Sequence, residues 1–459
     1  MRSTLITIFA VALLAAGAAP AAARADVSPN RIDVAAGAEP APPACPDAVI
    51  PGLAVLPNAV GCWNAIAVQA VRLTTPYQVQ GLAYVGYTQA AVYDAVTKIE
   101  GRYVAYDDFA TPPGVDVADA SPDAAAATAA YTMLTSSFLA LPAAAQSGLA
   151  TKYAGYLAAL RGAGETGVDD GVKLGEAAAS GLIAHRAGDR QESITFTPGP
   201  LTPGGWTFAP PPSVQSAMTP WLAVMKPFML ESPSQFRTDP PPRLSSRRWA
   251  KDYNEVKAYG AANSVLRSPA QTAVAKFWTA QAVNQSNQAF QDVAIAHEMD
   301  LVDAARLLAM GNLVESDAGI ACWDSKFHHL FWRPIMAIRN AAIDGNSATE
   351  PDASWSPLLT TPNHPEYPAA HTCLSGAEAE VYASVLGTRH IAVTIHGSAD
   401  GATNNWAATQ TFESAGDLER QVADARVWAG LHYRGSAVAG LELAEDVARW
   451  ALRRFFRPV

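Results

Sequence analysis

Apolar residues recur every three or four positions along most of this 459-residue chain, a spacing that predicts helices with one buried face. Alternating patterns typical of strands are scarce, so the pattern predicts an all-α fold. In the first half, helical spacing or an alanine-rich composition marks five stretches: 64–72, 79–98, 122–140, 143–161 and 168–187.

The second half of the chain contains a well-defined helix start. Ser268, Pro269 and Gln271 supply a capping serine, a proline for the first turn and a glutamine that can complete a capping box. From this start, one long helix is expected to run towards His297. Further helices are predicted at 300–320, 372–386, 414–429 and 435–455.

A segment of different composition separates the two halves. Residues 198–243 contain 12 prolines in 46 residues, which is typical of an irregular connector. The alternative is a loop that packs over the rest of the protein, because Trp206, Trp221 and Phe228 are too apolar for a solvated linker. We therefore expect two packed helical bundles in one globular unit, an N-terminal half at 26–197 and a C-terminal half at 244–459.

The first 25 residues have the features of a secretory signal peptide. Arg2 precedes an apolar run from Leu5 to Ala16, and Ala23-Arg24-Ala25 forms a small-residue cleavage site. The run is too short to cross a bilayer, and no later stretch is long and uninterrupted enough to do so. The mature protein is expected to be secreted or periplasmic and to lack a membrane span.

Charge and cysteine content bear on the partners and the compartment. The formal net charge is −10, and it becomes −12 without the two arginines of the signal peptide, whereas non-specific nucleic-acid binding needs a basic surface. Four cysteines in an exported protein permit two disulfides. Cys45–Cys62 is one candidate pair. Cys322–Cys373 is the other, and burial of these two as free thiols is an equal alternative.

Cations and histidines gather in three fragments near the C-terminus. A compact tetrahedral oxyanion such as phosphate or vanadate needs donors from several chain segments, and arginine offers paired charge-assisted bonds. The chain has only eight lysines, so a lysine among aromatic residues is expected to be paired. The fragments are Lys326 followed by Arg333-Pro334, then Pro368-Ala369-Ala370-His371, then Arg426 followed by His432.

The first fragment allows two helical arrangements. Lys326 and Arg333 are seven residues apart, which places them on nearly the same face of a continuous helix. Pro334 instead favours the first turn of a new helix. Either arrangement can aim both cations at one point.

The other two fragments depend on where helices begin and end. A helix is expected to begin just after Pro368, so that His371 and the backbone N–H of Ala370 lie at an anion-binding helix start. Arg426 and His432 would diverge by about 120° on an unbroken helix. Their convergence therefore requires the helix to end or bend near Gly430.

The ordered set resembles the vanadium-dependent haloperoxidases and the related type 2 phosphatidic acid phosphatase and bacterial acid phosphatase superfamily. Segments far from the set are similar to the bacterial haloperoxidase-like branch: 63–66, 90–95, 235–237, 240–242 and 277–278. The resemblance covers nearly the whole mature chain and implies a helical fold with an oxyanion site in the second bundle.

The resemblance implies a role for each matching residue. Lys326, Arg333 and Arg426 would bind the equatorial oxygens of vanadate. His432 would be the axial ligand to vanadium, or the nucleophile towards phosphorus in a phosphatase, and His371 the general acid–base. The implied substrates are hydrogen peroxide and a halide, or a phosphate ester, and phosphate fits the same site.

Some positions depart from the family pattern or leave the halide open. The family commonly has Pro-Ser-Gly-His at residues 368–371, so Ala369 lacks the serine hydroxyl, at a cost of about 1 kcal/mol of anion affinity. His364 is similar to the bromoperoxidases, whereas Trp323 is similar to the chloroperoxidases. Asp317 and Asp324 flank the lysine and are expected either to orient a cation or to lie on a helix surface.

The sequence therefore predicts a secreted, vanadate-dependent haloperoxidase-like enzyme. One alternative is an acid phosphatase that forms a phosphohistidine at His432. Another is an oxyanion-binding protein with little or no turnover, which the alanine at 369 suggests. A zinc site at His328 and His329 has less support, because adjacent residues on a helix do not face each other.

Overall fold

Helices make up nearly all the regular structure of this chain. The computed structural model describes residue 45 and residues 54–74, 77–189, 192–210 and 215–459. Within these residues the strands form a single antiparallel sheet, in which β1 (Val393–Gly397) pairs with β2 (Ala408–Phe412) and Val393 lies opposite Phe412. The predicted all-α fold class is confirmed, and the signal peptide expected at 1–25 lies outside the described residues.

All five stretches predicted in the first half are helical. The stretch at 143–161 is divided in two, because Gly148 has a positive φ of 79° and serves as the N-cap of a new helix. The helices are α1 (Ala59–Arg72), α2 (Gln78–Glu100), α3 (Pro122–Thr135), α4 (Ala143–Gln146), α5 (Leu149–Gly162) and α6 (Val168–His185).

The second half contains α7 (Arg247–Tyr259), α8 (Pro269–Phe277), α9 (Ala282–Ala296), α10 (Leu301–His329), α11 (Pro334–Arg339), α12 (Ala370–Leu386), α13 (Ala415–Trp428) and α14 (Arg434–Leu452), with short 3-10 helices η1 (Pro220–Val224) and η2 (Ala341–Ile343). The capping box at Ser268 and Gln271 is present. The single helix expected from there to His297 is wrong: α8 ends at Phe277, and the side chain of Gln281 caps a second helix by accepting the N–H of Asn284. The sequence reasoning did not predict α7.

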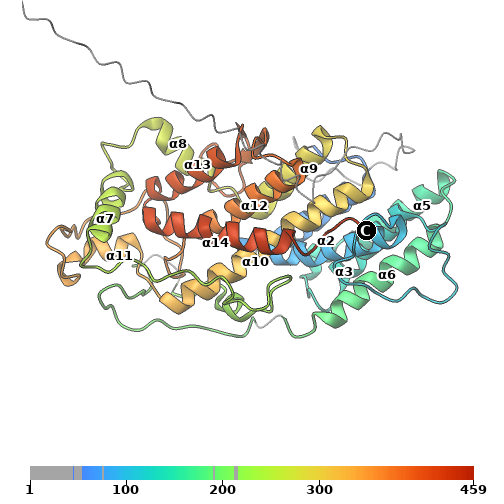
Figure 1. Ribbon diagram of the computed structural model, residues 1–459, viewed down its shortest axis with the longest axis horizontal. Coiled ribbons are helices and arrows are strands. Elements are labelled where there is room, and N and C mark those ends of the chain that lie inside the picture. The colour runs from blue at the N-terminus through green and yellow to red at the C-terminus, as the bar shows by residue number, and fades with distance from the viewer. Residues whose placement is uncertain (1–44, 46–53, 75–76, 190–191, 211–214) are drawn as a thin grey trace, which may run out of the picture.

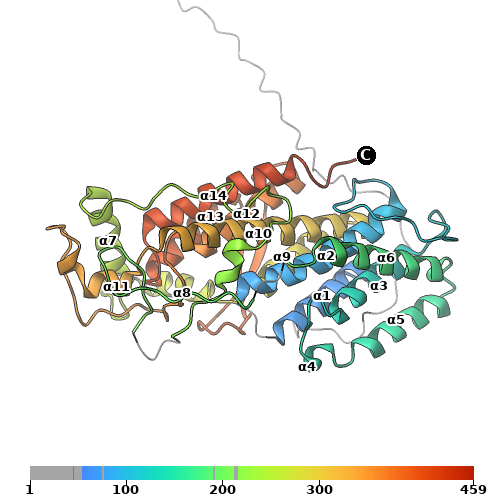
Figure 2. The same ribbon diagram turned by 90° about the horizontal axis from the view of Figure 1, so that it is seen from below.

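Helix α10 joins the two halves of the protein. It is 29 residues long, begins where the side chain of Asp300 accepts the N–H of Asp303, and is buried on all sides from Leu301 to Lys326. Figures 1 and 2 show it in the middle of an elongated molecule, with α3, α5 and α6 at one end and α7 and α11 at the other. One continuous apolar core contains residues of both halves, including Trp63 of α1 and Trp323 of α10.

The proline-rich connector packs against the helices. Trp206, Trp221 and Phe228 are 4%, 3% and 6% exposed, so the second interpretation of residues 198–243, a loop that covers the rest, describes the structure. The carboxylate of Asp317 on α10 accepts the backbone N–H groups of residues 228, 229 and 230 at 2.6–3.1 Å. Three such bonds anchor this segment of the connector to α10.

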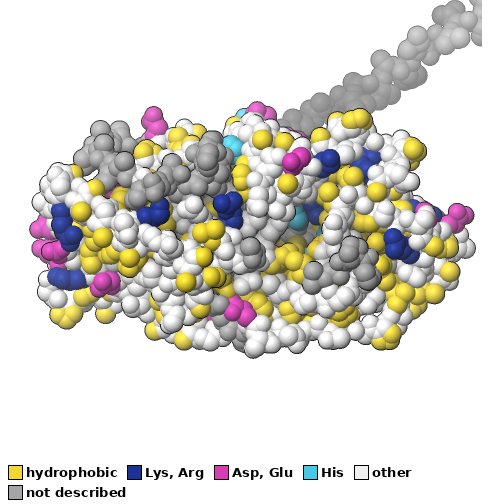
Figure 3. Space-filling view, turned by 180° about the vertical axis from the view of Figure 1, so that it is seen from behind, with side chains coloured by type: hydrophobic (Ala, Val, Ile, Leu, Met, Phe, Trp, Pro, Cys, Tyr) yellow, Lys and Arg dark blue, Asp and Glu magenta, His cyan; other side chains and the backbone are white. Residues whose placement is uncertain are grey.

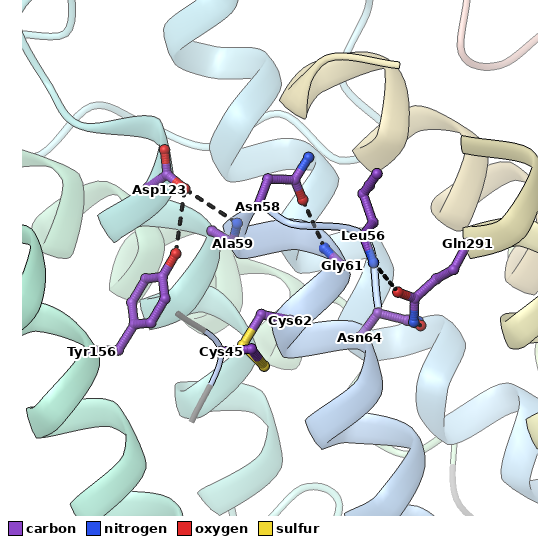
Figure 4. The surroundings of a disulfide bond; sticks show 10 residues. All are labelled: Cys45, Leu56, Asn58, Ala59, Gly61, Cys62, Asn64, Asp123, Tyr156 and Gln291. Carbon is purple, nitrogen blue, oxygen red and sulfur yellow. Dashed lines mark hydrogen bonds between the residues drawn. A yellow bond between two sulfur atoms is a disulfide. The ribbon is translucent and has the colours of Figure 1, made fainter. Parts of the chain in front are cut away.

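The four cysteines differ in state. Cys45 and Cys62 form a disulfide beside the start of α1, where Asn58 caps the N–H of Gly61 (Figure 4). Cys322 and Cys373 are buried free thiols, so the bridge considered for them is not formed and the free-thiol alternative holds. The two thiols hydrogen-bond to each other instead of being joined covalently.

The surface and the helices give little sign of a membrane-spanning part. Within the described ranges, no helix combines the length and apolarity needed to cross a bilayer. On the face in Figure 3, lysine and arginine side chains are scattered among apolar and uncharged ones. The candidate site gathers its cations in the interior instead.

Candidate functional site

The end of α10 and the start of α11 position the first two cations. Lys326 lies in the last turn of α10, which ends at Leu330 in a left-handed conformation with φ 49°. Arg333 is then the N-cap of α11, and Pro334 occupies its first turn. Of the two arrangements that the sequence allows, the structure contains the one with a new helix.

Helix α12 presents the second fragment at its N-terminus. It begins at Ala370, so His371 lies in its first turn, where backbone N–H groups lack partners within the helix. Ala369 is the N-cap and provides no side-chain bond, while its N–H donates to the carbonyl of Ser436 at 3.0 Å. Helix α14 crosses closely here, because a Cβ on Gly440 would collide with Thr372 and with the carbonyl of Ala369.

Gly430 ends α13 and turns the chain back. Its φ is +76°, and a side chain at this position would meet the carbonyl of Gly260. After this turn the N–H groups of Leu431 and His432 donate to the carbonyl of Arg426 at 3.2 and 3.3 Å. The helix break that convergence of Arg426 and His432 requires is therefore present.

Arg333 lies at the centre of the cluster. Its Nε donates to the carbonyl of His364 at 3.0 Å, and its Nη1 donates to the carbonyl of Leu431 at 3.0 Å and lies 3.1 Å from Nε2 of His432. Its Nη2 lies within 3.1 Å of both ring nitrogens of His364. Burial lowers the pKa of Arg333 to about 10.

Lys326 is paired, as expected for a rare lysine in an aromatic setting. Its ammonium donates to the backbone carbonyls of Pro365 at 3.1 Å and Glu366 at 2.9 Å, and also to that of Pro368. These bonds hold the segment that leads into α12. Burial lowers the pKa of Lys326 to about 8. Direct contact of Lys326 with an anion would require one of these carbonyls to be exchanged.

Arg426 has buried donors that no protein group satisfies. It is 3% exposed, and its Nε and Nη1 have no hydrogen-bond partner in the described part of the chain. Burial, and after it the charge of Arg333, lowers the pKa of Arg426 to about 9. Leaving such donors buried and unpaired costs a few kcal/mol, so an anionic partner is the natural complement.

The three histidines are held neutral. Burial is the largest cause that lowers the pKa of His364, His371 and His432 well below 6.5, followed by the charge of Arg333 for His364 and His432 and that of Arg426 for His371. Nε2 of His371 lies 3.1 Å from the carbonyl of Trp278. Because a carbonyl only accepts, this bond places the proton of His371 on Nε2 and leaves the lone pair on Nδ1.

An aromatic group joins the cluster on one side. The rings of Trp323 and His364 lie 5.0 Å apart, so the two residues that resemble those of different haloperoxidases are neighbours. Tyr77, which precedes α2, places its ring 5.5 Å from that of Trp323, and its hydroxyl lies 2.8 Å from Nε2 of His364. The first half of the chain therefore contributes to the site.

Two of the predicted residues belong elsewhere. Asp317 and Asp324 were expected to orient a cation or to lie on a helix surface. Asp317 holds the backbone of residues 228–230, and Asp324 forms a bidentate pair at 2.7 Å with a cation of the connector, Arg237. Both therefore bind the connector to α10. They do so because the connector packs along this face of α10, and a role for either acid at the site stays a prediction.

Two contacting residues were missed by sequence reasoning. Tyr77 had no detectable signal, because its partner His364 is 287 positions away. Glu366 accepts a hydrogen bond from Nδ1 of His432 at 2.9 Å and is fully buried. An acid between two prolines, in the segment just before His371, was a signal that could have identified it.

Known proteins resemble this chain in sequence and in fold. Residues 306–459, which include all three cationic fragments, match the family described as the VCPO second helical-bundle domain. A vanadium chloroperoxidase from Curvularia inaequalis is 29% identical over 175 residues, which cover 31% of this chain and 28% of that relative.

Solved structures match over a greater length. A bacterial vanadium-dependent iodoperoxidase is similar with a TM-score of 0.71 and 19% identity, covering 87% of this chain and 96% of that one. The holo form of a bacterial vanadium-dependent chloroperoxidase is similar with a TM-score of 0.63 and 17% identity, covering 85% and 95%. These two likenesses show the shared fold. The sequence matches therefore relate residues 306–459 to the second helical-bundle domain of vanadium chloroperoxidase, and the structures show that most of the chain shares the fold of bacterial vanadium-dependent haloperoxidases.

Proposed function

We propose that this protein is a secreted, vanadate-dependent haloperoxidase that oxidises a halide with hydrogen peroxide. The observation that carries the proposal is the buried guanidinium of Arg426, whose Nε and Nη1 have no protein partner among the described residues. It lies in a cluster with two further buried cations and three neutral histidines. An oxyanion would satisfy its donors, and the family relationship favours vanadate.

The residues present fit vanadate in charge and in donor type. Arg333 and Arg426 provide guanidinium groups, and Lys326 adds a third positive charge. Within the described residues, Glu366 is the single buried carboxylate that hydrogen-bonds to this cluster, so the positive charges outnumber the negative one. The N-terminus of α12 adds the backbone N–H groups of Ala370 and His371, with the positive end of the helix dipole. The missing serine hydroxyl at Ala369 removes one neutral bond from a cage dominated by charge.

His432 is the residue that would bind vanadium directly. Its Nε2 lies 3.1 Å from Nη1 of Arg333, so this nitrogen faces a cation of the cluster. Because the pKa of this ring is lowered by burial and by Arg333, His432 is neutral at physiological pH and has a lone pair to donate. Bound vanadate would supply the activation of hydrogen peroxide for oxidation of a halide to hypohalous acid.

The remaining groups orient the reaction and move protons. His371 is neutral, with its lone pair on Nδ1, which suits it to accept a proton at the anion and return it. The aromatic group of Tyr77, Trp323 and His364 would line the halide approach. Lys326 holds the 365–368 segment and contributes its charge to the cage.

Export is part of the proposal. The disulfide between Cys45 and Cys62 supports an oxidising compartment, because such bonds rarely persist in the cytosol. Expression of the full chain in a secreting bacterial host should yield a mature protein that starts at Asp26. A cell-associated protein with an intact N-terminus would contradict export while leaving the catalytic proposal unaffected.

A vanadate titration tests the activity. The mature protein is prepared without phosphate, orthovanadate is added, and oxidation of iodide, bromide and chloride by hydrogen peroxide is measured beside hydrolysis of an aryl phosphate. We expect vanadate-dependent halide oxidation, and we expect His432→Ala to abolish it. His297→Ala, at an exposed histidine outside the cluster, is the control and should preserve the activity. Hydrolysis inhibited by vanadate, without halide oxidation, would identify a phosphatase instead. Tight phosphate binding with neither activity would identify a binding protein.

A further inference from the structure

Glu366 contacts His432 on the side of the ring opposite the cage. Its Oε1 lies 2.9 Å from Nδ1 of His432 and also accepts the backbone N–H of Tyr433 at 3.1 Å. Its Oε2 accepts the hydroxyl of Ser436 at 2.7 Å. His432 is 2% exposed and Glu366 fully buried, so this contact is shielded from water. Two donors besides His432, both from residues that follow it in the chain, therefore hold the carboxylate in place.

The neighbouring bonds determine which nitrogen of His432 carries the proton. A guanidinium only donates, so the contact from Nη1 of Arg333 at 3.1 Å requires a lone pair on Nε2. A neutral imidazole then has its proton on Nδ1, where Glu366 accepts it. Both neighbours favour the same tautomer, and that tautomer leaves a lone pair on Nε2, which a metal ligand or a nucleophile needs.

We propose that Glu366 is a positioning residue of the site. It fixes His432 with its proton on Nδ1, and it raises the basicity of the Nε2 lone pair, which would bind vanadate. The proposal rests on the proposed function and assigns to Glu366 an action through His432 and not on the substrate. A carboxylate that accepts the second ring N–H of a ligating histidine orients the ring and raises its basicity.

Glu366 also connects His432 to Lys326. The backbone carbonyl of Glu366 accepts a bond from the ammonium of Lys326 at 2.9 Å, while its side chain holds the histidine. Glu366 therefore places His432 and Lys326 relative to each other. Burial raises the pKa of Glu366 to about 7, and the nearby charges of Arg333 and Lys326 oppose that rise and favour the carboxylate.

The test combines a tautomer measurement with vanadate binding. In the full mature protein labelled with 15N-histidine, two-dimensional NMR should show an unprotonated Nε2 and a protonated Nδ1 for His432, identified by its loss in His432→Ala. Glu366→Gln keeps an acceptor but removes the charge, and should weaken orthovanadate binding by about 10–100-fold. Glu366→Asp should recover part of the affinity.

Glu378→Gln is the matched control. Glu378 is an equally buried glutamate, on α12, that hydrogen-bonds Tyr382 and not a cage residue. Its replacement should change orthovanadate affinity by no more than about twofold. That change is much smaller than the loss of affinity expected when a ligating histidine loses its hydrogen-bond partner. A proton found on Nε2 of His432 in the wild type, or wild-type vanadate affinity in folded Glu366→Gln, would overturn the proposal. If the wild type fails to bind vanadate, the proposed function fails, and the tautomer measurement still decides the role of Glu366.

Discussion

Nη1 of Arg333 lies 3.1 Å from Nε2 of His432, although 99 positions separate the two residues. The contact exists because α10 ends before Arg333 and because Gly430 turns the chain after α13. It places a positive charge against the nitrogen that would meet an oxyanion. Arg426 lies close enough to lower the pKa of both His371 and His432, yet has two nitrogens without a partner among the described residues.

Replacement of Arg426 by methionine should affect stability and binding in opposite directions. Without an anion, an unpaired buried guanidinium is unfavourable, so Arg426→Met should raise the free energy of unfolding by at least about 1 kcal/mol. Loss of its charge-assisted bonds should weaken orthovanadate binding about tenfold or more. Urea unfolding and calorimetric titration measure the two effects.

Arg306→Met is the control for that experiment. Arg306 is also fully buried, but its Nε donates to the carbonyl of Phe456 at 2.8 Å. Its loss should therefore destabilise the protein. If Arg426→Met proves as destabilising as Arg306→Met, then Arg426 has a structural partner and the argument from its unpaired donors is lost.

Restoring a hydroxyl at position 369 should strengthen anion binding. Ala369 is the N-cap of α12 and offers no side-chain acceptor or donor. Ala369→Ser should increase orthovanadate affinity about fivefold through one added hydrogen bond of about 1 kcal/mol. Ala423→Ser, at a buried alanine of the same small apolar cluster, should give no such gain. Equal affinities for the two variants would show that the residue 369 side chain does not reach the anion.

The two acids that bind the connector should differ in their effect on stability. Asp317→Asn replaces one of the two carboxylate oxygens that accept three backbone N–H groups with an NH2 group, so that at least one N–H loses its acceptor and faces a donor, and it should cost about 3 kcal/mol or more. Asp324→Asn weakens a partly exposed pair with Arg237 and should cost under about 1 kcal/mol. Urea unfolding measures both. A large loss of vanadate affinity in folded Asp324→Asn would show that this residue also supports the anion site.

Stability should fall as the pH rises through neutrality, partly because of Glu315 and Glu378. Burial raises the pKa of both carboxyls, and the charge of Glu378 raises that of Glu315 further. At a pH above the ordinary pKa of a glutamate, the unfolded chain has released these two protons, whereas the folded protein still holds them. The free energy of unfolding therefore declines as pH rises through the raised pKa values.

Urea unfolding at pH 5.5 and 8.5 checks this dependence. Glu378→Gln removes one of the two titrating groups, so the difference in stability between the two pH values should be smaller than in the wild type. Glu445→Gln, at an exposed glutamate paired with Arg449, is the matched control and should behave like the wild type. If the stability of Glu378→Gln differs between pH 5.5 and 8.5 as much as that of the wild type, then Glu378 does not contribute to the pH dependence.

Much of the fold could be predicted from local signals. Helical spacing or an alanine-rich composition located α1, α2, α3, α5, α6, α10, α12, α13 and α14, and the ends that matter to the site follow from Pro334, Pro368 and Gly430. The break between α8 and α9 was missed, because Gln281 acts as a cap in the middle of an unbroken apolar pattern. Helix α7 was missed as well, since it follows directly after the proline-rich connector.

The sequence by itself determined the helical class, the helix boundaries near Pro368 and Gly430, and the cationic fragments and their order, because each depends on residue types within a few positions of one another. The tertiary structure alone decided the contacts between fragments. Asp317 and Asp324 bind the connector. Tyr77 lies within hydrogen-bond distance of His364, 287 positions away, and Glu366 hydrogen-bonds to His432, 66 positions away. No local pattern records such pairs, because they form only when the helices pack and bury polar groups that must then find partners.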